Sequence, residues 1–166
     1  PMAKSVTSTV LVKGPYTDTT LTPLKVLRIG SKLYIGFNST DKSVCRFGDS
    51  WEGDGLFMKI EDATNVDKEY KLYFNAGGAD PNMVYEGPGA GFGSGVGVKA
   101  VGTVVNDTTQ VDNGYSAELM IDLAALGYTT VPATVQVMFV LFDPDGYHNG
   151  MLPWGVKGTF HKTFWG

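Results

Sequence analysis

Short runs of β-branched and aromatic residues recur along the chain, and each run is bounded by Gly, Asp, Asn or Pro. Runs of this kind, in which apolar and polar positions alternate, predict half-buried β-strands joined by turns. The clearest case is a hairpin: residues 25–29 and 32–38 flank Gly30-Ser31, a two-residue loop whose glycine can adopt a positive φ. The other predicted strands are residues 5–12, 56–61, 70–75, 98–105, 115–121 and 134–142.

A helical pattern occurs only at residues 122–127, where Asp122 can cap the first turn and Gly127 can close the last. This segment predicts a single helical turn. Strands without interleaved helices cannot form a parallel α/β sheet. The fold class is therefore predicted to be all-β, an antiparallel two-sheet β-sandwich of the jelly-roll or immunoglobulin-like kind, with residues 1–166 forming one domain.

Two segments lack a strand pattern. Residues 77–97 are rich in Gly and show no clear alternation, and they predict a long loop or an irregular excursion. Residues 143–159 are the second such region. Long loops in compact domains are usually functional or disordered, so both segments are of interest for function.

Composition and charge narrow the classes of partner. The net charge is −4 and no cluster of Lys and Arg occurs, which argues against nucleic acid and against an anionic membrane surface. No apolar run approaches the 18 or more residues of a spanning helix, so membrane insertion is not expected.

The composition also bears on localisation, since low charge with many glycines is typical of secreted all-β proteins. Because the N-terminus lacks a signal-peptide pattern, the chain is either cytosolic or an excised interior piece of a longer exported protein.

The residues for a catalytic centre do not assemble in the sequence. His148 and His161 lack the spacing and acidic partners of a zinc site, and the lone Cys45 excludes multi-cysteine motifs and favours a small core residue. Glu52 and Asp54 could be paired, but adjacent acids in a glycine-rich turn are more often solvated than catalytic. We therefore expect a protein that is not an enzyme and that has no organic cofactor.

Two loops combine a tryptophan with polar side chains. Trp51 adjoins Glu52 and Asp54 in the stretch DSWEGDG, and Trp154 follows Tyr147 and Asn149. Sugars present apolar CH faces and a rim of hydroxyls, so a site for them needs flat aromatic rings surrounded by hydrogen-bonding groups. The alternative is that each tryptophan closes one end of the sandwich core. The sequence leaves both interpretations open.

The run Asp143-Pro144-Asp145-Gly146 resembles the start of an oxygen-rich calcium loop, with Asn149 as a further candidate ligand. It lacks a closing acid and flanking helices, and an Asp-Pro-Asp-Gly run is first of all a turn. Asp143 and Asp145 are therefore candidate ligands for a structural Ca²⁺ ion.

The order of these pieces resembles a known family. Residues 25–29 and 32–41 resemble the paired strands that open the family 9 carbohydrate-binding modules and the related DOMON domains. Residues 49–60 are similar to their tryptophan-acid turn running into a strand, and residues 115–127 resemble the late strand that ends in a short helical turn. Residues 163–166 resemble the start of their last strand.

This resemblance implies a jelly-roll-like sandwich that is secreted or displayed on a bacterial surface, as a monomeric module of a larger glycan-degrading enzyme or adhesin. It also implies bound calcium and a carbohydrate held between two aromatic rings. The glycine-rich residues 77–97 depart from the family pattern. The implied ligand-binding residues are Trp51 and Trp154 as the rings, with Arg46, Glu52, Asp54, Tyr147 and Asn149 around them.

Two other functions remain as alternatives. One branch of the superfamily binds haem b through a Met and a His, and the sequence has six methionines and two histidines, although methionine is more often a core residue. A structural or adhesion spacer that binds protein would use neither tryptophan.

Overall fold

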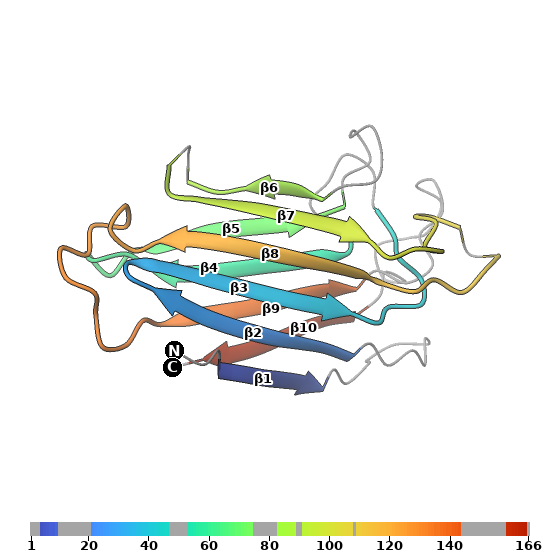
Figure 1. The fold of residues 1–166 in the computed structure, drawn as a ribbon, viewed down its shortest axis with the longest axis horizontal. Coiled ribbons are helices and arrows are strands. Elements are labelled where there is room, and N and C mark those ends of the chain that lie inside the picture. The colour runs from blue at the N-terminus through green and yellow to red at the C-terminus, as the bar shows by residue number, and fades with distance from the viewer. Residues whose placement is uncertain are drawn as a thin grey trace.

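The computed structural model describes residues 4–9, 21–46, 53–74, 83–88, 91–107, 109–143 and 159–165. Within these ranges, ten antiparallel strands form two five-stranded sheets. The prediction of an all-β, two-sheet sandwich is confirmed, and Figure 1 shows one sheet lying over the other. In spatial order, sheet A consists of β1 (Lys4–Thr9), β2 (Leu21–Ile29), β3 (Lys32–Ser39), β8 (Tyr115–Asp122) and β7 (Gly93–Lys99). Sheet B consists of β10 (Thr159–Trp165), β9 (Val137–Asp143), β4 (Gly55–Glu61), β5 (Asp67–Tyr73) and β6 (Val84–Glu86).

The core lies between the sheets and follows the alternation of the strands. Every second residue of β3, β4, β5 and β8 points inward, as the strand period of two requires. The Tyr115 ring contacts the rings of Phe37 and Phe74 edge-on, at centroid distances of 5.9 and 5.3 Å. Other fully buried side chains among the described residues are Ile35, Val44, Leu56, Met58, Ile60, Tyr70, Leu72, Leu119, Ile121 and Leu123.

The predicted hairpin at Gly30-Ser31 is confirmed. Ile29 pairs with Lys32, and Gly30 has a φ of 59°, a backbone conformation that glycine adopts without steric cost. Along β3, Ile35 and Phe37 face the core, whereas Tyr34 is exposed. The register of this hairpin sets which side chains of sheet A point outward.

The predicted helical turn after β8 is also confirmed. The Asp122 carboxylate accepts a hydrogen bond from the Ala124 N–H (3.0 Å), as a capping residue does. Gly127 ends the turn with a φ of 89°.

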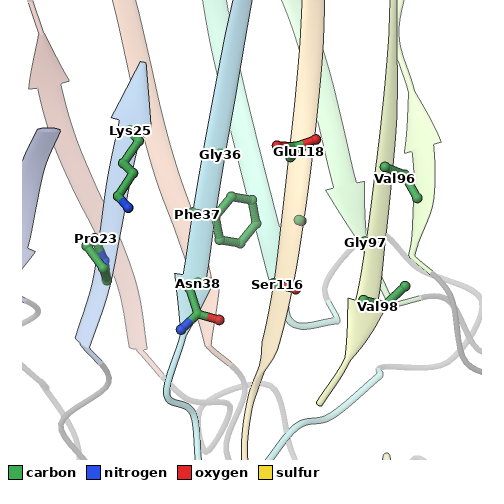
Figure 2. Close-up of a pocket in the computed structure, with 11 residues that line it drawn as sticks. Pro23, Lys25, Gly36, Phe37, Asn38, Val96, Gly97, Val98, Ser116 and Glu118 are labelled. Carbon is green, nitrogen blue, oxygen red and sulfur yellow. The ribbon is translucent and has the colours of Figure 1, made fainter. Parts of the chain in front are cut away.

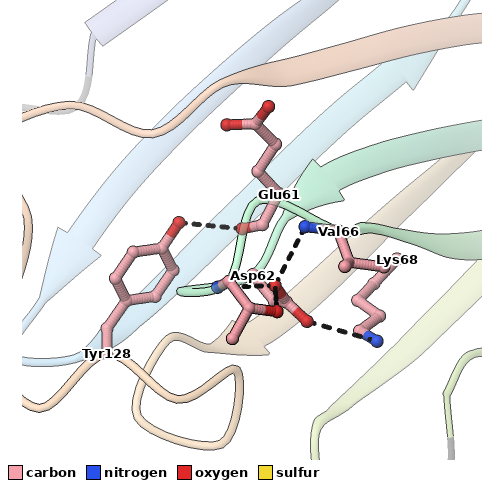
Figure 3. Close-up of polar contacts among 6 residues, drawn as sticks. Glu61, Asp62, Val66, Lys68 and Tyr128 are labelled. Carbon is pink, nitrogen blue, oxygen red and sulfur yellow. Dashed lines mark hydrogen bonds and ion pairs between the residues drawn. The ribbon is translucent and has the colours of Figure 1, made fainter.

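This turn is joined to the β4–β5 connection at one end of the sandwich (Figure 3). The Tyr128 hydroxyl donates a hydrogen bond to the Glu61 carbonyl oxygen (2.9 Å). The Asp62 carboxylate accepts hydrogen bonds from Thr64, through its hydroxyl and its N–H, and from the Val66 N–H. These bonds, first of all the one from the Thr64 hydroxyl, lower the pKa of the Asp62 carboxyl well below its ordinary value.

The prediction for residues 77–105 is wrong in two places. Residues 84–86 form β6, and β7 covers residues 93–99 rather than 98–105. The inward positions of β7 are glycines, and a Cβ at Gly97 would lie 2.3 Å from the Met83 sulfur. Since glycine has no hydrophobic side chain, an alternation of glycines escapes a hydrophobicity pattern.

Candidate functional site

The two loops predicted to carry the binding residues are attached at the same end of sheet B. Strands β4 and β9 are antiparallel neighbours, and Gly55 at the start of β4 pairs with Phe142 near the end of β9 (Figure 1, right). The segment with Trp51 runs into β4 at Gly55, and the segment with Trp154 leaves β9 after Asp143. Segments that are distant in the sequence therefore begin and end on adjacent strands.

Several predicted residues fall outside the described part of the chain, and their roles stay predictions. Asp143 is the last residue of β9, where the structure describes the backbone. The residues outside the described ranges are Trp51, Glu52, Asp145, Tyr147, Asn149 and Trp154.

Asp54 fixes the start of β4 to the rest of the molecule. Its side chain is 1% exposed and accepts a hydrogen bond from the Cys45 N–H. Its own N–H donates to the Cys45 carbonyl oxygen (2.8 Å), and its carbonyl accepts from the Phe74 N–H (2.9 Å). The expectation that Asp54 is solvated is wrong, because its side chain is buried. A buried carboxylate needs hydrogen-bond donors, and the Cys45 N–H is one of them. Its predicted contact with a ligand stays a prediction.

Gly53 in the same stretch allows a close approach of two backbone segments. A Cβ at this position would lie 2.1 Å from the Phe74 carbonyl oxygen. A larger residue would push the start of β4 away from the end of β5. The packing of Gly53 and Asp54 therefore fixes the start of β4, the strand that follows Trp51 in the sequence.

Arg46 belongs to a segment with a fixed backbone. Its N–H donates to the Asn106 side-chain oxygen (2.8 Å), and the Asn106 N–H donates to the Val44 carbonyl (3.0 Å). The Val44 N–H donates in turn to the carboxylate of Asp112, which is buried. Arg46 is half-buried at the end of this network. The neighbouring Cys45 is 1% exposed, which confirms it as a core residue.

The outer face of sheet B carries polar and aromatic side chains beside Gly55. Tyr73 pairs with Gly55 in the ladder, its side chain is only 2% exposed, and its hydroxyl donates to a Glu86 carboxylate oxygen (2.6 Å). The Lys71 ammonium lies 5.9 Å from the centroid of the Phe57 ring, within the range of a cation–π contact. The sequence analysis missed these residues. The outward positions 69, 71 and 73 of β5, all charged or polar, were the signal for them.

A metal site does not assemble within the described ranges, where no group of three or more His, Cys, Asp and Glu side chains converges. The buried carboxylates at this end of the sandwich, Asp41, Asp54 and Asp112, each accept a backbone N–H. The calcium site at Asp143 and Asp145 stays a prediction. Met58 and Met83 are buried in the core, which agrees with the interpretation of methionine as a core residue.

Comparison with known proteins gives the fold. No family model and no curated protein sequence matches the chain. A carbohydrate-binding module of family 9 from Caldicellulosiruptor kristjanssonii, solved in complex with cellotriose, superimposes with a TM-score of 0.60 at 9% identity, over 95% of this chain and 70% of that one. The chain has the fold of a family 9 carbohydrate-binding module.

A second solved structure agrees. A proposed carbohydrate-binding protein from Bacteroides uniformis superimposes with a TM-score of 0.52 at 9% identity, over 96% of this chain and 76% of that one. Sequence identities this low establish a shared fold, and function must be argued from the site. In the part of the chain that the structure describes, no helix is long and apolar enough to cross a membrane.

Proposed function

We propose that the chain is a non-catalytic carbohydrate-binding module. The observation that carries this proposal is the pairing of Gly55 with Phe142, which attaches the two tryptophan-bearing segments to adjacent strands at one end of sheet B. The likeness to a family 9 module that was solved with cellotriose supports the same ligand class.

In this proposal Trp51 and Trp154 are the flat rings that pack against the apolar faces of a sugar. The surrounding hydrogen bonds come from Arg46, Glu52, Tyr147 and Asn149. The described end of sheet B supplies a rigid base, because Asp54 and Gly53 lock the start of β4 against neighbouring segments. A rigid base lowers the entropy that is lost when the ligand binds.

The biological setting is part of the proposal. The module belongs to a secreted or surface-displayed bacterial protein, where it would bring a glycan-active enzyme or an adhesin to polysaccharide or host glycan. It acts as a monomer within that larger chain. A Ca²⁺ ion at Asp143 and Asp145 would neutralise two carboxylates and order the loop that carries Trp154.

Tryptophan fluorescence tests the proposal directly. The chain is titrated with a panel of mono- and disaccharides and of plant and host glycans, with and without a calcium chelator. We expect a saturable spectral shift with one sugar class, and loss of that shift in Trp154→Ala. Trp165→Phe is the matched control, since Trp165 lies in β10, outside both loops, and should leave the shift in place. A spectrum that no glycan changes would identify the rings as core residues and the domain as a structural or protein-binding module.

A further inference from the structure

A trough of about 580 Å³ lies on the outer face of sheet A, on the other sheet from the Gly55 end of β4. Figure 2 shows its construction: Pro23 and Lys25 of β2 form one side, and Val96 and Val98 of β7 form the other. Strands β3 and β8 form the floor between them. The outward-facing floor residues are Gly36, Asn38, Ser116 and Glu118, and Phe37 and Ala117 of the same strands also line the trough.

The register of the sheet explains the hollow. Lys25, Gly36, Glu118 and Val96 lie in one row across four strands. Because neighbouring strands are about 4.8 Å apart, the backbones of Lys25 and Glu118 are separated by roughly 10 Å with only a glycine between them. A Cβ at Gly36 would make ordinary van der Waals contact with the Glu118 side chain, 3.8 Å from its Cγ, and would meet nothing closer, so the position has room for a Cβ. The missing side chain of Gly36 forms the lowest part of the trough.

The trough contains two charged groups, Lys25 and Glu118. Among the described residues, neither Lys25 nor Glu118 forms an ion pair. On the outer face of sheet B the situation is the opposite, since Lys59 pairs with Glu69 at 2.9 Å. One cation and one anion among the lining residues give the trough no net charge, while they supply a donor and an acceptor.

The residues that line the trough disfavour three classes of ligand: a highly charged polymer, an amphipathic helix and an added β-strand. A highly charged polymer would meet a group of its own sign at Lys25 or Glu118. An amphipathic helix requires a groove that is apolar throughout, whereas Lys25, Asn38 and Glu118 place polar groups along this trough. An added β-strand pairs with the edge of a sheet, whereas the trough lies on a face. A ligand with many neutral hydroxyls and apolar CH faces meets none of these objections.

We infer that this trough is a second binding site, separate from the Trp51 and Trp154 loops, and that it takes a neutral oligosaccharide chain. Val96, Val98 and Pro23 contact the CH faces of the sugar. Lys25 and Glu118 hydrogen-bond to its hydroxyls, together with Asn38 and Ser116.

The row beyond the glycine extends the site. Tyr34 and Met120 pair across β3 and β8 on the same outer face, and Tyr34 is 37% exposed. An aromatic ring at this position can cover the apolar face of a further sugar unit. A chain of several sugars lying along the strands would therefore contact both rows. Two sites on opposite sheets would also raise the avidity of the module for a polysaccharide.

Nuclear magnetic resonance of the isotope-labelled 166-residue chain tests the inference. Cellohexaose and xylohexaose are the neutral probes, and polygalacturonate is the anionic probe. We expect a neutral probe to shift the backbone amide signals of Gly36, Ser116 and Glu118 saturably, whether or not Gly55 and Tyr73 on sheet B also shift. The trough signals should shift equally in Trp51→Ala/Trp154→Ala, which removes the proposed loop site. If only the trough signals respond in the wild-type chain, the loop proposal fails and the trough stands.

Gly36→Leu fills the floor of the trough at an outward position with room for a Cβ. We expect it to weaken trough binding by roughly tenfold or more, whereas Ala124→Leu, at an exposed position of the turn after β8 and outside both rows, should leave it unchanged. Circular dichroism verifies that both variants fold. The inference is overturned if neither neutral probe shifts the trough signals, if Gly36→Leu binds like the wild type, or if polygalacturonate binds the trough more tightly than the neutral probes.

Discussion

Strands β7 and β8 are neighbours in one sheet, yet they place apolar side chains on opposite faces. In β8 the inward residues are Ala117, Leu119 and Ile121, and the outward residue Glu118 is exposed. In β7 the inward residues are glycines, while the outward Val96 and Val98 are 59% and 49% exposed. One strand supplies the core with its own side chains, and the other leaves room for side chains from elsewhere.

The space beneath β7 is occupied from sheet B. Cβ atoms at Gly95 and Gly97 would lie 2.8 Å from the Tyr85 ring and 2.3 Å from the Met83 sulfur. The Tyr85 ring in turn stacks on Tyr70 at a centroid distance of 6.2 Å. The inward face of β7 therefore needs glycines, because side chains from the segment around β6 already fill the space beneath it. This arrangement also explains why the outward valines of β7 are available as a wall of the trough.

The largest expected effect is on the β8 side of this comparison. Leu119→Ala removes a side chain that is 1% exposed, and we expect a loss of about 2–5 kcal/mol in the free energy of unfolding, because a cavity remains in the core. Urea denaturation measures this loss. Ser116→Ala, an exposed outward position of the same strand, is the control and should change the stability little. A loss for Leu119→Ala no larger than that of the control would contradict the assignment of β8 as a core strand.

The next effect is on β7, where adding a side chain should destabilise. Gly97→Leu inserts atoms against Met83 and Ala117, and overpacking of this kind costs about 1–3 kcal/mol. Ser94→Leu, on the outward face of the same strand, should be close to neutral. A double-mutant cycle with Met83→Ala sharpens the test, since a smaller residue at 83 should relieve part of the cost. Equal stability of Gly97→Leu and Ser94→Leu would mean that the inward face of β7 has room to spare.

An effect of intermediate size is expected at high pH, where the buried Tyr70 beneath β7 should make the free energy of unfolding depend on pH. Burial raises the pKa of Tyr70 to about 12, and among the described residues its hydroxyl has no hydrogen-bond partner. The unfolded chain therefore releases this proton near pH 10, before the folded chain does, and stability should fall as the pH rises above 10. By pH 11 the contribution of Tyr70 is a loss on the order of 1 kcal/mol.

Denaturation curves at pH 8 and pH 11 measure this loss. Tyr70→Phe should remove that share of the decrease, while Tyr34→Phe, at an exposed position, should not. The same slope in both variants would show that the Tyr70 hydroxyl ionises as freely in the folded chain as in the unfolded one.

The smallest expected effect is at the outward valines. Val96→Thr keeps the β-branched shape at a position that is 59% exposed, so the free energy of unfolding should change by less than about 0.5 kcal/mol. The midpoint of urea denaturation checks this. A loss above about 1 kcal/mol would indicate that Val96 is covered, and the contrast between β7 and β8 would not hold.

Local signals were sufficient for much of the fold. Gly30-Ser31 specified its hairpin, Asp122 and Gly127 specified the helical turn, and the alternation along residues 32–38 and 115–121 gave β3 and β8. The prediction missed the strand at residues 93–97, because every second residue there is a glycine, and glycine adds nothing to a hydrophobicity pattern. For the candidate site, the sequence pointed to the two loops, but it did not point to Tyr73 and Glu86, which meet only when β5 pairs with β6.

By itself the sequence determined the class of the fold, because strand alternation, turn residues and helix caps act over a few neighbouring positions. Only the tertiary structure decided which strands are neighbours. It placed Gly55 beside Phe142, buried Asp54 against Cys45, and left Gly36 as the gap between Lys25 and Glu118. These relations depend on long-range strand pairing and on how two sheets share one core, and no local pattern of residues encodes them.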